Sequence, residues 1–300
     1  MRYLNLSVDD FANMSHENAN ALRSVGVNCK DYSINRHAFN YETQSLPIRP
    51  QDIKHIVGGF DCVQIFHSDE RLLRHVLEGK PKKIVVYHTG TRYRQNHEKY
   101  NHIFRNYKQL TDQTEFVKLG NMSYIAPHTT LTSKPKRQDG KLIIGHYPSN
   151  PLVKGTDSIE YVLNKYRDDF EIRIDRTKVG HKQQLKRMSE CHVYVELFAP
   201  IQQGKQYGCF GVTAFEATAL GCHVITQNLN PKVYDDVYGA CYFSLANDKE
   251  SFIRILDELK DVDRNMLLTP AGFYINHNIE STGYKILELT KWKRKNLLRY

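Results

Sequence analysis

The sequence predicts an α/β protein made of two consecutive doubly wound units, each built on a parallel sheet. Segments typical of strands and of helices alternate along the whole chain of 300 residues. The alternation is interrupted once, by the polar and basic stretch "TTLTSKPKRQDG" at residues 129–140, which has no apolar period. We interpret this stretch as an interdomain linker, because the chain is long enough to bury a core on either side of it.

The first unit is expected over residues 1–132. "RYLNLSV" predicts a strand, and the following segment predicts a helix with Ser15 as its N-cap and Gly26 as its stop. Two β-branched runs, "DCVQIFH" and "KIVVYH", flank a segment with apolar residues at helical spacing. This is a βαβ unit, which implies parallel strands. A polar helix at "HEKYNHIFRNYKQL" and strands at "EFVKL" and "SYIAP" are expected to complete the unit.

The second unit is expected over residues 141–285, followed by a basic helix or tail at 286–300. Its strands and helices are expected at "KLIIGHYP", "KGTDSIEYVLNKY", "EIRI", "HKQQLKRMSEC", "HVYVEL", "VTAFEATALG" and "HVIT". In such sheets the ligand lies beyond the carboxyl ends of the strands. The loops expected to face a ligand therefore follow "IVVYH", "IIGHYP" and "VYVEL", and precede "VTAFEA".

Composition is that of an ordinary globular protein, with 40% hydrophobic and 25% charged residues. No apolar run approaches the roughly 18 residues of a membrane span, and the amino terminus shows no signal-peptide pattern. The six cysteines are scattered without a CxxC pair, and the 14 histidines lack ligand spacing with acidic neighbours. We therefore expect reduced thiols, no metal site and a cytoplasmic location.

The net charge of +9 favours acidic partners, namely nucleoside diphosphates, nucleic acid or anionic lipid. Part of this charge lies in the last ten residues, "KWKRKNLLRY", where five basic side chains accompany Trp292 and two leucines. Three interpretations stay open: a solvated tail, an anionic membrane surface that would make the protein peripheral, or nucleic acid.

The stretch "GCFGVTAFEATALGCHVIT", residues 208–226, joins a glycine-rich loop to a helix of small residues. Gly208 and Gly211 bracket the expected helix start at Val212, where the helix dipole suits a phosphate and glycine allows its close approach. Glu216 lies about one turn further on, among apolar residues, and a carboxylate there can accept two hydrogen bonds from a ribose diol. The alternative is a tight structural junction between loop and helix.

This stretch resembles the donor-binding signature of GT-B glycosyltransferases, especially the large retaining family four, whose usual form is E-G-F-G-x-x-x-x-E-A-x-A-x-G-x-P-V-I. "SNPLVKGTD" is similar to that family's Lys-Gly loop, and "VVYHTGTRYR" to its first-domain strand ending in a histidine and a glycine. The resemblance covers most of the chain and is strongest from Ile143 to Cys241. It implies two Rossmann-like domains facing each other across a cleft, with a nucleotide sugar on the second and an acceptor on the first.

The resemblance also implies roles for single residues. Glu216 would bind the donor's ribose, Lys154 would supply positive charge as the bond to the sugar breaks, and His88 would project toward the transferred sugar or the acceptor. Together, the donor-side candidates are Gly155, Tyr207, Gly208, Gly211, Val212, Thr213 and Glu216. Arg92 and Arg94, which follow His88, could bind an anionic acceptor or be solvated.

Some residues depart from the family's pattern. Gly208 stands where the family usually has the first of two glutamates, the one that touches the donor sugar, and His223 replaces a proline. No arginine precedes the Lys-Gly pair. The nucleotide half of the site is therefore expected to be intact and the sugar half altered. The Asp-x-Asp at Asp261 and Asp263 follows a predicted helix and is interpreted as a turn or cap, whereas the polar residues after the first strand receive no role. Those residues are Asp9, Asp10 and Asn13.

The expected function is transfer of a sugar from a UDP- or GDP-linked donor to an unidentified acceptor, such as a glycan or a lipid-linked glycan. Retention at the anomeric carbon, independence of metal or other cofactors, and a place in glycan or polysaccharide biosynthesis are expected. The alternatives are a nucleotide-sugar epimerase on the same fold, a nucleic-acid-modifying glycosyltransferase, and an inactive nucleotide-binding module. An epimerase should show several carboxylates in the crevice, and the predicted loops offer few.

Overall fold

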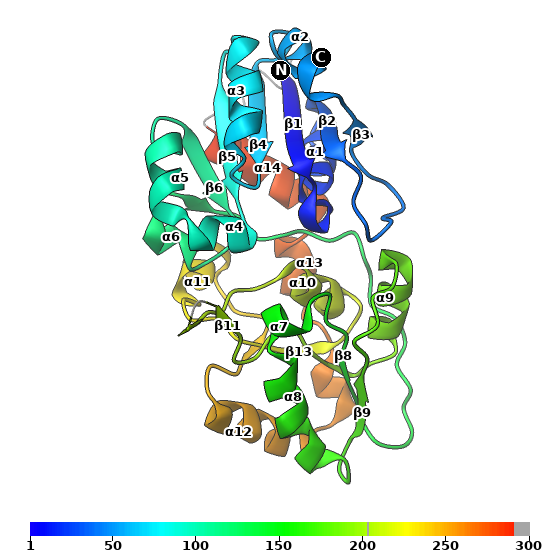
Figure 1. Cartoon of the computed structure of the whole chain (residues 1–300). Helices are drawn as coiled ribbons and strands as arrows, with labels where there is room; N and C mark the ends of the chain where they lie inside the picture. Colours follow the sequence, from blue (N-terminus) through cyan, green and yellow to red (C-terminus); the bar gives the residue numbers. More distant parts are fainter. Residues whose placement is uncertain (203, 291–300) are drawn as a thin grey trace. The chain divides into compact units, whose positions relative to one another are not determined.

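The computed structural model describes residues 1–202 and 204–290, which form two compact units (Figure 1). The first unit contains residues 1–128 and the segment from Asn276 onward, and the second contains Thr129–Ile275. The chain therefore returns to the first unit after Ile275, whereas the sequence predicted a second domain that continues to residue 285. The basic tail at 291–300, with Trp292, lies outside the described residues.

A seven-stranded parallel sheet forms the centre of the first unit, in the order β3-β2-β1-β4-β5-β6-β7. Its strands are β1 (Arg2–Asp9), β2 (Asn28–Asn35), β3 (Leu46–Pro47), β4 (Cys62–Phe66), β5 (Ile84–His88), β6 (Lys108–Thr111) and β7 (Ser123–Tyr124). All residues of β4 and β5 are buried, as expected for parallel strands that are covered on both faces. The strand order reverses between β1 and β4, which is the switch point of this sheet.

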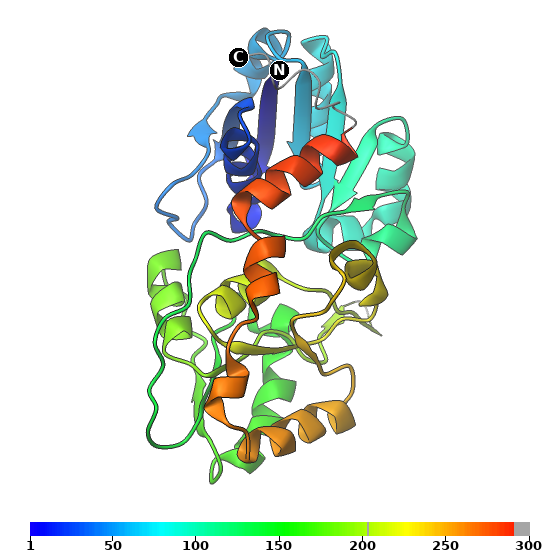
Figure 2. The same cartoon turned by 180° about the vertical axis from the view of Figure 1, so that it is seen from behind.

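Helices cover both faces of this sheet. They are α1 (Met14–Ser24), α2 (Ile53–Val57), α3 (Glu70–Glu78), α4 (Gly90–Gln95), α5 (His97–Phe104), α6 (Phe116–Leu119) and α14 (Ile279–Leu289). Figure 2 shows α14 on the same face of the sheet as α1. A Cβ on Gly283 of α14 would lie 2.1 Å from the carbonyl oxygen of Ala21, so glycine allows these two helices to approach closely.

Parts of the prediction for the first unit were wrong. "EFVKL" was expected to be a strand, but Phe116–Leu119 is the short helix α6, and the strand β6 begins at Lys108 inside the predicted polar helix. The strand β2 was not predicted. The strand β6 and the helix α6 have four residues each, and segments this short carry too little periodicity to separate a strand from a helix, so tertiary pairing decides between them.

The start of α1 also differs from the prediction. Its N-cap is Asn13, in the left-handed region with φ of 58°, rather than Ser15. The carboxylate of Asp10 accepts the backbone N–H groups of Ser15, at 2.7 Å, and His16, at 3.1 Å. Asp10 therefore satisfies free donors at this helix start, a role that the sequence alone did not assign.

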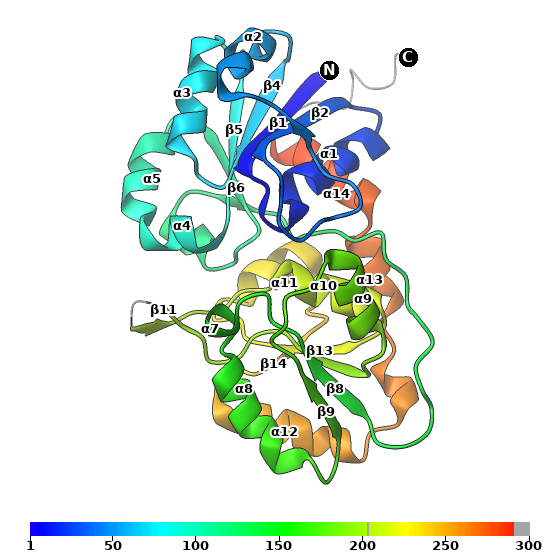
Figure 3. The ribbon, with the colours of Figure 1, turned by 45° about the vertical axis from the view of Figure 1, so that its right-hand side comes forward.

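The second unit contains a five-stranded parallel sheet in the order β14-β13-β10-β8-β9 (Figure 3). Its strands are β8 (Ile143–His146), β9 (Glu171–Ile174), β10 (Val193–Val195), β13 (His223–Thr226) and β14 (Ser244–Leu245), beside a small antiparallel pair, β11 (Ile201–Gln202) and β12 (Lys205–Gln206). The order reverses between β8 and β10. The loops after these two strands therefore occupy the switch point, where such folds bind their ligands.

Helices cover the second sheet as well. They are α7 (Pro151–Lys154), α8 (Thr156–Leu163), α9 (His181–Ser189), α10 (Val212–Ala219), α11 (Lys232–Tyr238), α12 (Lys249–Lys260) and α13 (Ala271–Asn276). Apolar residues of α8 and α12 form one core with β8, β10 and β13. Asp261 ends α12, and Asp263 accepts the N–H of Asn265 at 3.0 Å, which confirms the interpretation of the Asp-x-Asp as a turn and cap. No helix in the described part of the chain has the length and apolar character that crossing a membrane requires.

Candidate functional site

The loop after β8 holds Lys154 at the switch point of the second sheet. Asn150 caps α7, and Pro151 occupies its first turn, where the missing N–H costs nothing. Gly155 ends this short helix with φ of +68°, and a Cβ there would lie 2.0 Å from the carbonyl oxygen of Phe198. Only glycine fits such a position, so Gly155 lets the chain turn sharply and keeps Lys154 at the edge of the sheet.

Glu196, which follows β10 directly, is the partner of Lys154. The two side chains form an ion pair in which Glu196 is fully buried and Lys154 is 17% exposed. Thr213 donates a hydrogen bond to Oε1 of Glu196 at 3.1 Å, and Thr226 donates one to Oε2 at 2.8 Å. The sequence pointed to the loop after "VYVEL" without naming Glu196. The sequence signal that could have identified Glu196 is a carboxylate directly at the end of an apolar strand.

The amino terminus of α10 lies against this ion pair. Its N-cap, Gly211, has no side chain to cap the free N–H groups of the first turn, which includes Val212 and Thr213. A Cβ on Gly211 would lie 2.5 Å from Oε1 of Glu196 and 3.1 Å from Nζ of Lys154. The positive end of a helix and a lysine therefore meet at one place, and only glycine leaves room there for the ion pair.

Glu216 lies on the same helix and forms a second polar pair. Its Oε1 is 2.7 Å from Nε2 of His181, the first residue of α9, and both side chains are partly exposed, by 13% and 22% respectively. The pair is thus accessible to a ligand at this edge. His181 was missed by the sequence analysis, because nothing in the chain shows that the starts of α9 and α10 are neighbours.

Tyr207 and Gly208 contact the residues on either side of the glycine-rich loop. The hydroxyl of Tyr207 donates to the carbonyl oxygen of Val153, and the carbonyl oxygen of Tyr207 accepts from Nε2 of Gln227 at 2.7 Å. A Cβ on Gly208 would lie within 2.8 Å of the side chain of Gln227. In the described structure these two residues therefore pack the glycine-rich loop against the α7 loop and β13.

His146, at the end of β8, ties the strands of the site together. Its Nδ1 donates to the carbonyl oxygen of Val195 at 2.7 Å, so its Nε2 accepts the hydroxyl hydrogen of Thr156 at 2.9 Å. Burial lowers the pKa of His146 to about 4, with a smaller contribution from the charge of Lys154. A neutral imidazole therefore links β8, β10 and α8.

The switch point of the first unit carries aromatic side chains. Phe11, which follows β1, is 51% exposed, and its ring meets those of His67, with centroids 5.2 Å apart, and His37, at 6.5 Å. The backbones of Ala12 and His67 are left-handed, with φ of 54° and 65°. Non-glycine residues adopt this conformation at a cost of about 1–3 kcal/mol each, and such strain is common at functional sites.

His88 lies at the carboxyl end of β5, as predicted, but its ring is fully buried. Nδ1 of His88 is 2.8 Å from the hydroxyl of Ser68, and the ring packs on Tyr93 and Phe104. Burial lowers the pKa of His88 to about 3. In the described structure it is a neutral histidine that joins the loop after β4 to β5.

The two arginine candidates form ion pairs within the first unit. Arg92 pairs with Asp69, the N-cap of α3, at 2.7 Å. Arg94 pairs with Glu115 and lies over the ring of Phe116. Both arginines therefore have a partner within the protein and are not purely solvated side chains.

Asp112, after β6, is a further candidate that the sequence analysis missed. Its side chain is buried, and burial raises its pKa to about 6, partly opposed by a hydrogen bond from Thr89. A carboxyl group with such a pKa can exchange a proton near neutral pH.

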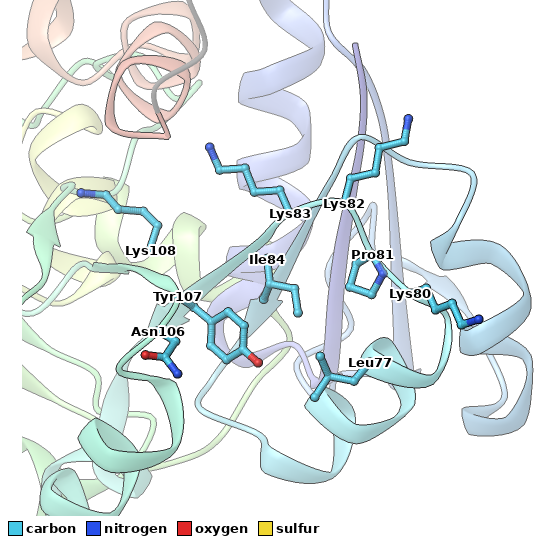
Figure 4. A pocket seen from close by; sticks show the side chains of 9 residues that line it. All are labelled: Leu77, Lys80, Pro81, Lys82, Lys83, Ile84, Asn106, Tyr107 and Lys108. Carbon is cyan, nitrogen blue, oxygen red and sulfur yellow. The ribbon is translucent and has the colours of Figure 1, made fainter.

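No group of three or more histidine, cysteine or acidic residues suited to a metal ion occurs among residues 1–202 and 204–290. A separate hollow of about 500 Å³ lies at the opposite, amino-terminal edge of the first sheet (Figure 4). Its basic lining consists of Lys80, Lys82, Lys83 and Lys108. Lys82 pairs with Asp61, and Lys83 donates to the carbonyl oxygen of Thr290, which ends α14.

Comparisons with known proteins give matches in structure only. No family model and no curated protein matches the chain. The catalytic domain of starch synthase IV from Arabidopsis thaliana, bound to ADP and acarbose, matches with a TM-score of 0.63 and 8% identity, over 97% of this chain and 99% of that one. A structure described in a study of trehalose-6-phosphate synthase and of glycosyl transfer with retention matches with a TM-score of 0.55 and 11% identity, over 98% and 100%.

UDP-N-acetylglucosamine 2-epimerase from Rickettsia bellii is also similar in fold, with a TM-score of 0.50 and 10% identity over 97% of this chain and 96% of that one. Identities this low show the fold alone. The chain is thus similar to GT-B glycosyltransferases and has the GT-B type of fold, two Rossmann-like parallel α/β units, as the sequence resemblance implied.

Proposed function

We propose that the protein is a glycosyltransferase that moves a sugar from a UDP- or GDP-linked donor to an acceptor held by the first unit. The observation that carries this proposal is the meeting of Lys154, the amino terminus of α10 and Glu216 at the carboxyl edge of the second sheet. A lysine and a helix dipole suit a diphosphate, and a carboxylate suits the ribose hydroxyls. Lys154 then stabilises the charge that develops on the leaving diphosphate.

We propose in addition that transfer proceeds with retention and without a metal ion, as part of glycan or polysaccharide biosynthesis. The sequence resemblance supports retention. The described donor edge supports independence of metal, since Lys154 and the dipole of α10 supply the counter-charge there. Proton NMR of the first-formed product tests retention, and inversion would refute it. Activity that EDTA abolishes and manganese restores would refute independence of metal.

For the acceptor side we propose that a sugar ring packs on Phe11. An exposed aromatic ring at the switch point offers a flat apolar face, and its edge contacts with His67 and His37 hold it in place. His88, Arg92 and Arg94 then act as positioning residues for the neighbouring loops. Phe11→Ala is expected to raise the KM for the acceptor at least fivefold and to leave the KM for the donor unchanged.

A nucleotide-sugar epimerase is the second candidate, because Asp112 is a carboxyl group whose raised pKa of about 6 suits proton transfer at carbon. The two functions differ in whether a product forms without an acceptor. Epimerisation consumes the nucleotide sugar alone, whereas transfer releases the nucleoside diphosphate only when an acceptor is present.

The test is a thermal-shift panel of UDP, GDP, ADP and their sugars. A ligand at 100 times its Kd stabilises the folded state by about 2.7 kcal/mol, which gives a clear shift in Tm. Stabilisation by one nucleoside diphosphate and its sugar, and by no other base, is the expected result. No shift with any of them would refute a nucleotide-sugar enzyme of either kind.

A further inference from the structure

Glu196 places a negative charge among groups that otherwise suit an anion. Its carboxylate lies beside Gly211, at the positive end of α10, where the proposed diphosphate would bind. A bare carboxylate at such a place repels a second anion. Its presence therefore has to be explained by what it does to Lys154.

The surroundings of Glu196 are built to hold a carboxylate. A fully buried charge is stable only when it is paired and its remaining oxygen lone pairs are satisfied. Lys154 supplies the pairing, and Thr213 and Thr226 donate to one carboxylate oxygen each. These partners come from α7, α10 and β13, so the carboxylate joins three elements at the edge of the sheet.

The position of Lys154 depends on this pairing. A lysine side chain has a flexible stem of four carbons and a strongly hydrated ammonium group, and it samples many conformations when it has no partner. In this protein Glu196 holds Nζ of Lys154 against Gly211, and Lys154 still keeps some exposure toward a ligand. The full burial of Glu196 keeps the carboxylate itself away from a substrate.

We propose that Glu196 is a positioning residue for Lys154, and that it also weakens the hold of the site on the nucleoside diphosphate. The first effect follows from the ion pair, which fixes the ammonium group before the donor arrives. The second follows because the pair is neutral as a whole, so the bound diphosphate meets less net positive charge than a free lysine would offer. An interaction raises kcat when it stabilises the transition state more than the bound ground state. A fixed ammonium group in a site that binds the nucleoside diphosphate only modestly meets this condition. This inference rests on the proposed function.

The substitution Glu196→Gln tests the effect of the charge at nearly constant side-chain shape. The amide keeps the volume, while the negative charge is lost. We expect about tenfold tighter binding of the nucleoside diphosphate in calorimetry and a kcat at least tenfold lower, since the lysine is no longer oriented and the product leaves more slowly. A role in stability alone would lower Tm and leave affinity and kcat together near the wild-type values.

Glu196→Asp and Thr226→Val are the matched variants. Aspartate keeps the charge on a side chain one methylene shorter, so it should lower kcat and leave the Kd of the nucleoside diphosphate within about threefold. Thr226→Val removes the hydrogen bond to Oε2 and keeps the ion pair, so it should lower kcat less than Glu196→Gln does and leave the Kd within about threefold. In the double variant Glu196→Gln with Lys154→Ala, the tighter binding should disappear, because it acts through Lys154.

The same titrations with inorganic pyrophosphate separate this inference from the proposed function. Wild-type protein that binds pyrophosphate but no nucleoside diphosphate would refute the proposed function, and tighter pyrophosphate binding by Glu196→Gln would still support the inference. Unchanged affinity and kcat in a folded Glu196→Gln variant would overturn the inference while the proposed function stands. Wild-type protein that binds neither ligand would overturn both.

Discussion

The proposed function makes Glu216 the residue on which binding of a nucleoside should depend most directly. Its carboxylate is partly exposed, beside His181, on the helix whose amino terminus faces Lys154. Glu216→Ala should weaken binding of the nucleoside diphosphate by about 1.5–3 kcal/mol, the range for a hydrogen-bonding group that carries a charge. Isothermal titration calorimetry measures the change.

The matched control is Glu160→Ala. Glu160 is an acidic residue of the same unit that pairs with Arg176 at the surface. This substitution removes one negative charge from the unit and should leave the affinity unchanged. Equal affinities for wild type and Glu216→Ala would remove Glu216 from the site.

At the scale of single elements, the junction of α7 and α8 depends on Gly155. Gly155→Ala should destabilise the second unit by more than 2 kcal/mol, because the new Cβ combines a left-handed backbone with a collision against the carbonyl oxygen of Phe198. Urea unfolding measures the change. Gly239, with φ of +82° and open space around a Cβ, isolates the backbone contribution, and Gly239→Ala should cost only about 1 kcal/mol. Equal costs at the two positions would contradict the collision.

The elements also show where sequence patterns are sufficient. The long periodic helices, α3 and α12, and the β-branched strands β4 and β5 lie where the sequence predicted them. The short strands β3, β7 and β14 have two residues each, and their existence depends on pairing with a neighbour. Pattern alone assigned the four-residue helix at Phe116–Leu119 to the wrong class.

At the scale of the whole molecule, buried histidines make stability depend on pH. Burial lowers the pKa of His88 and of His277 to about 3 and that of His146 to about 4. Below pH 6.5 the unfolded chain binds protons that the folded chain does not bind, so the contribution of these histidines to stability is present above that pH and is lost as the pH falls toward 3 to 4. Each histidine should add a slope that is small at pH 7 and approaches about 1.4 kcal/mol per pH unit well below pH 6.5, and urea unfolding at pH 7 and at pH 5 measures the loss. Equal stability at the two pH values would contradict the assignment of neutral histidines.

Binding of the basic tail to an anionic membrane is the second prediction at the scale of the whole chain. Lys83 lines the basic hollow (Figure 4) and donates to the carbonyl oxygen of Thr290, so the described part of the chain ends at a lysine of this surface. Deletion of 291–300 should weaken binding to vesicles that contain phosphatidylserine, by up to about 1 kcal/mol for each basic residue near the bilayer. Co-sedimentation with phosphatidylserine vesicles and with neutral vesicles measures this.

A second tail variant separates charge from packing. Replacement of the five basic residues by glutamine keeps Trp292 and should weaken vesicle binding as the deletion does. Only the deletion removes Trp292, so a lower Tm in the deletion alone would assign a structural role to Trp292. Unchanged vesicle binding in both variants would refute the membrane contact, and loss of binding to a DNA fragment instead would favour nucleic acid.

Local chemistry along the chain was enough to predict the class of fold and a helix that starts directly after the glycine-rich loop. Alternating periodicities predict two parallel sheets, and the spacing of Gly208, Gly211 and Glu216 predicts a helix start suited to a nucleotide. These features are readable because each depends on residues within a few turns of one another. The folded chain alone decided the partners of the key side chains: Glu196 lies 42 residues from Lys154, and His181 lies 35 residues from Glu216. The first pair exists because β8 and β10 are neighbours in the sheet, and the second because α9 and α10 are in contact. Strand order is a property of packing, and periodicity along the chain does not encode it.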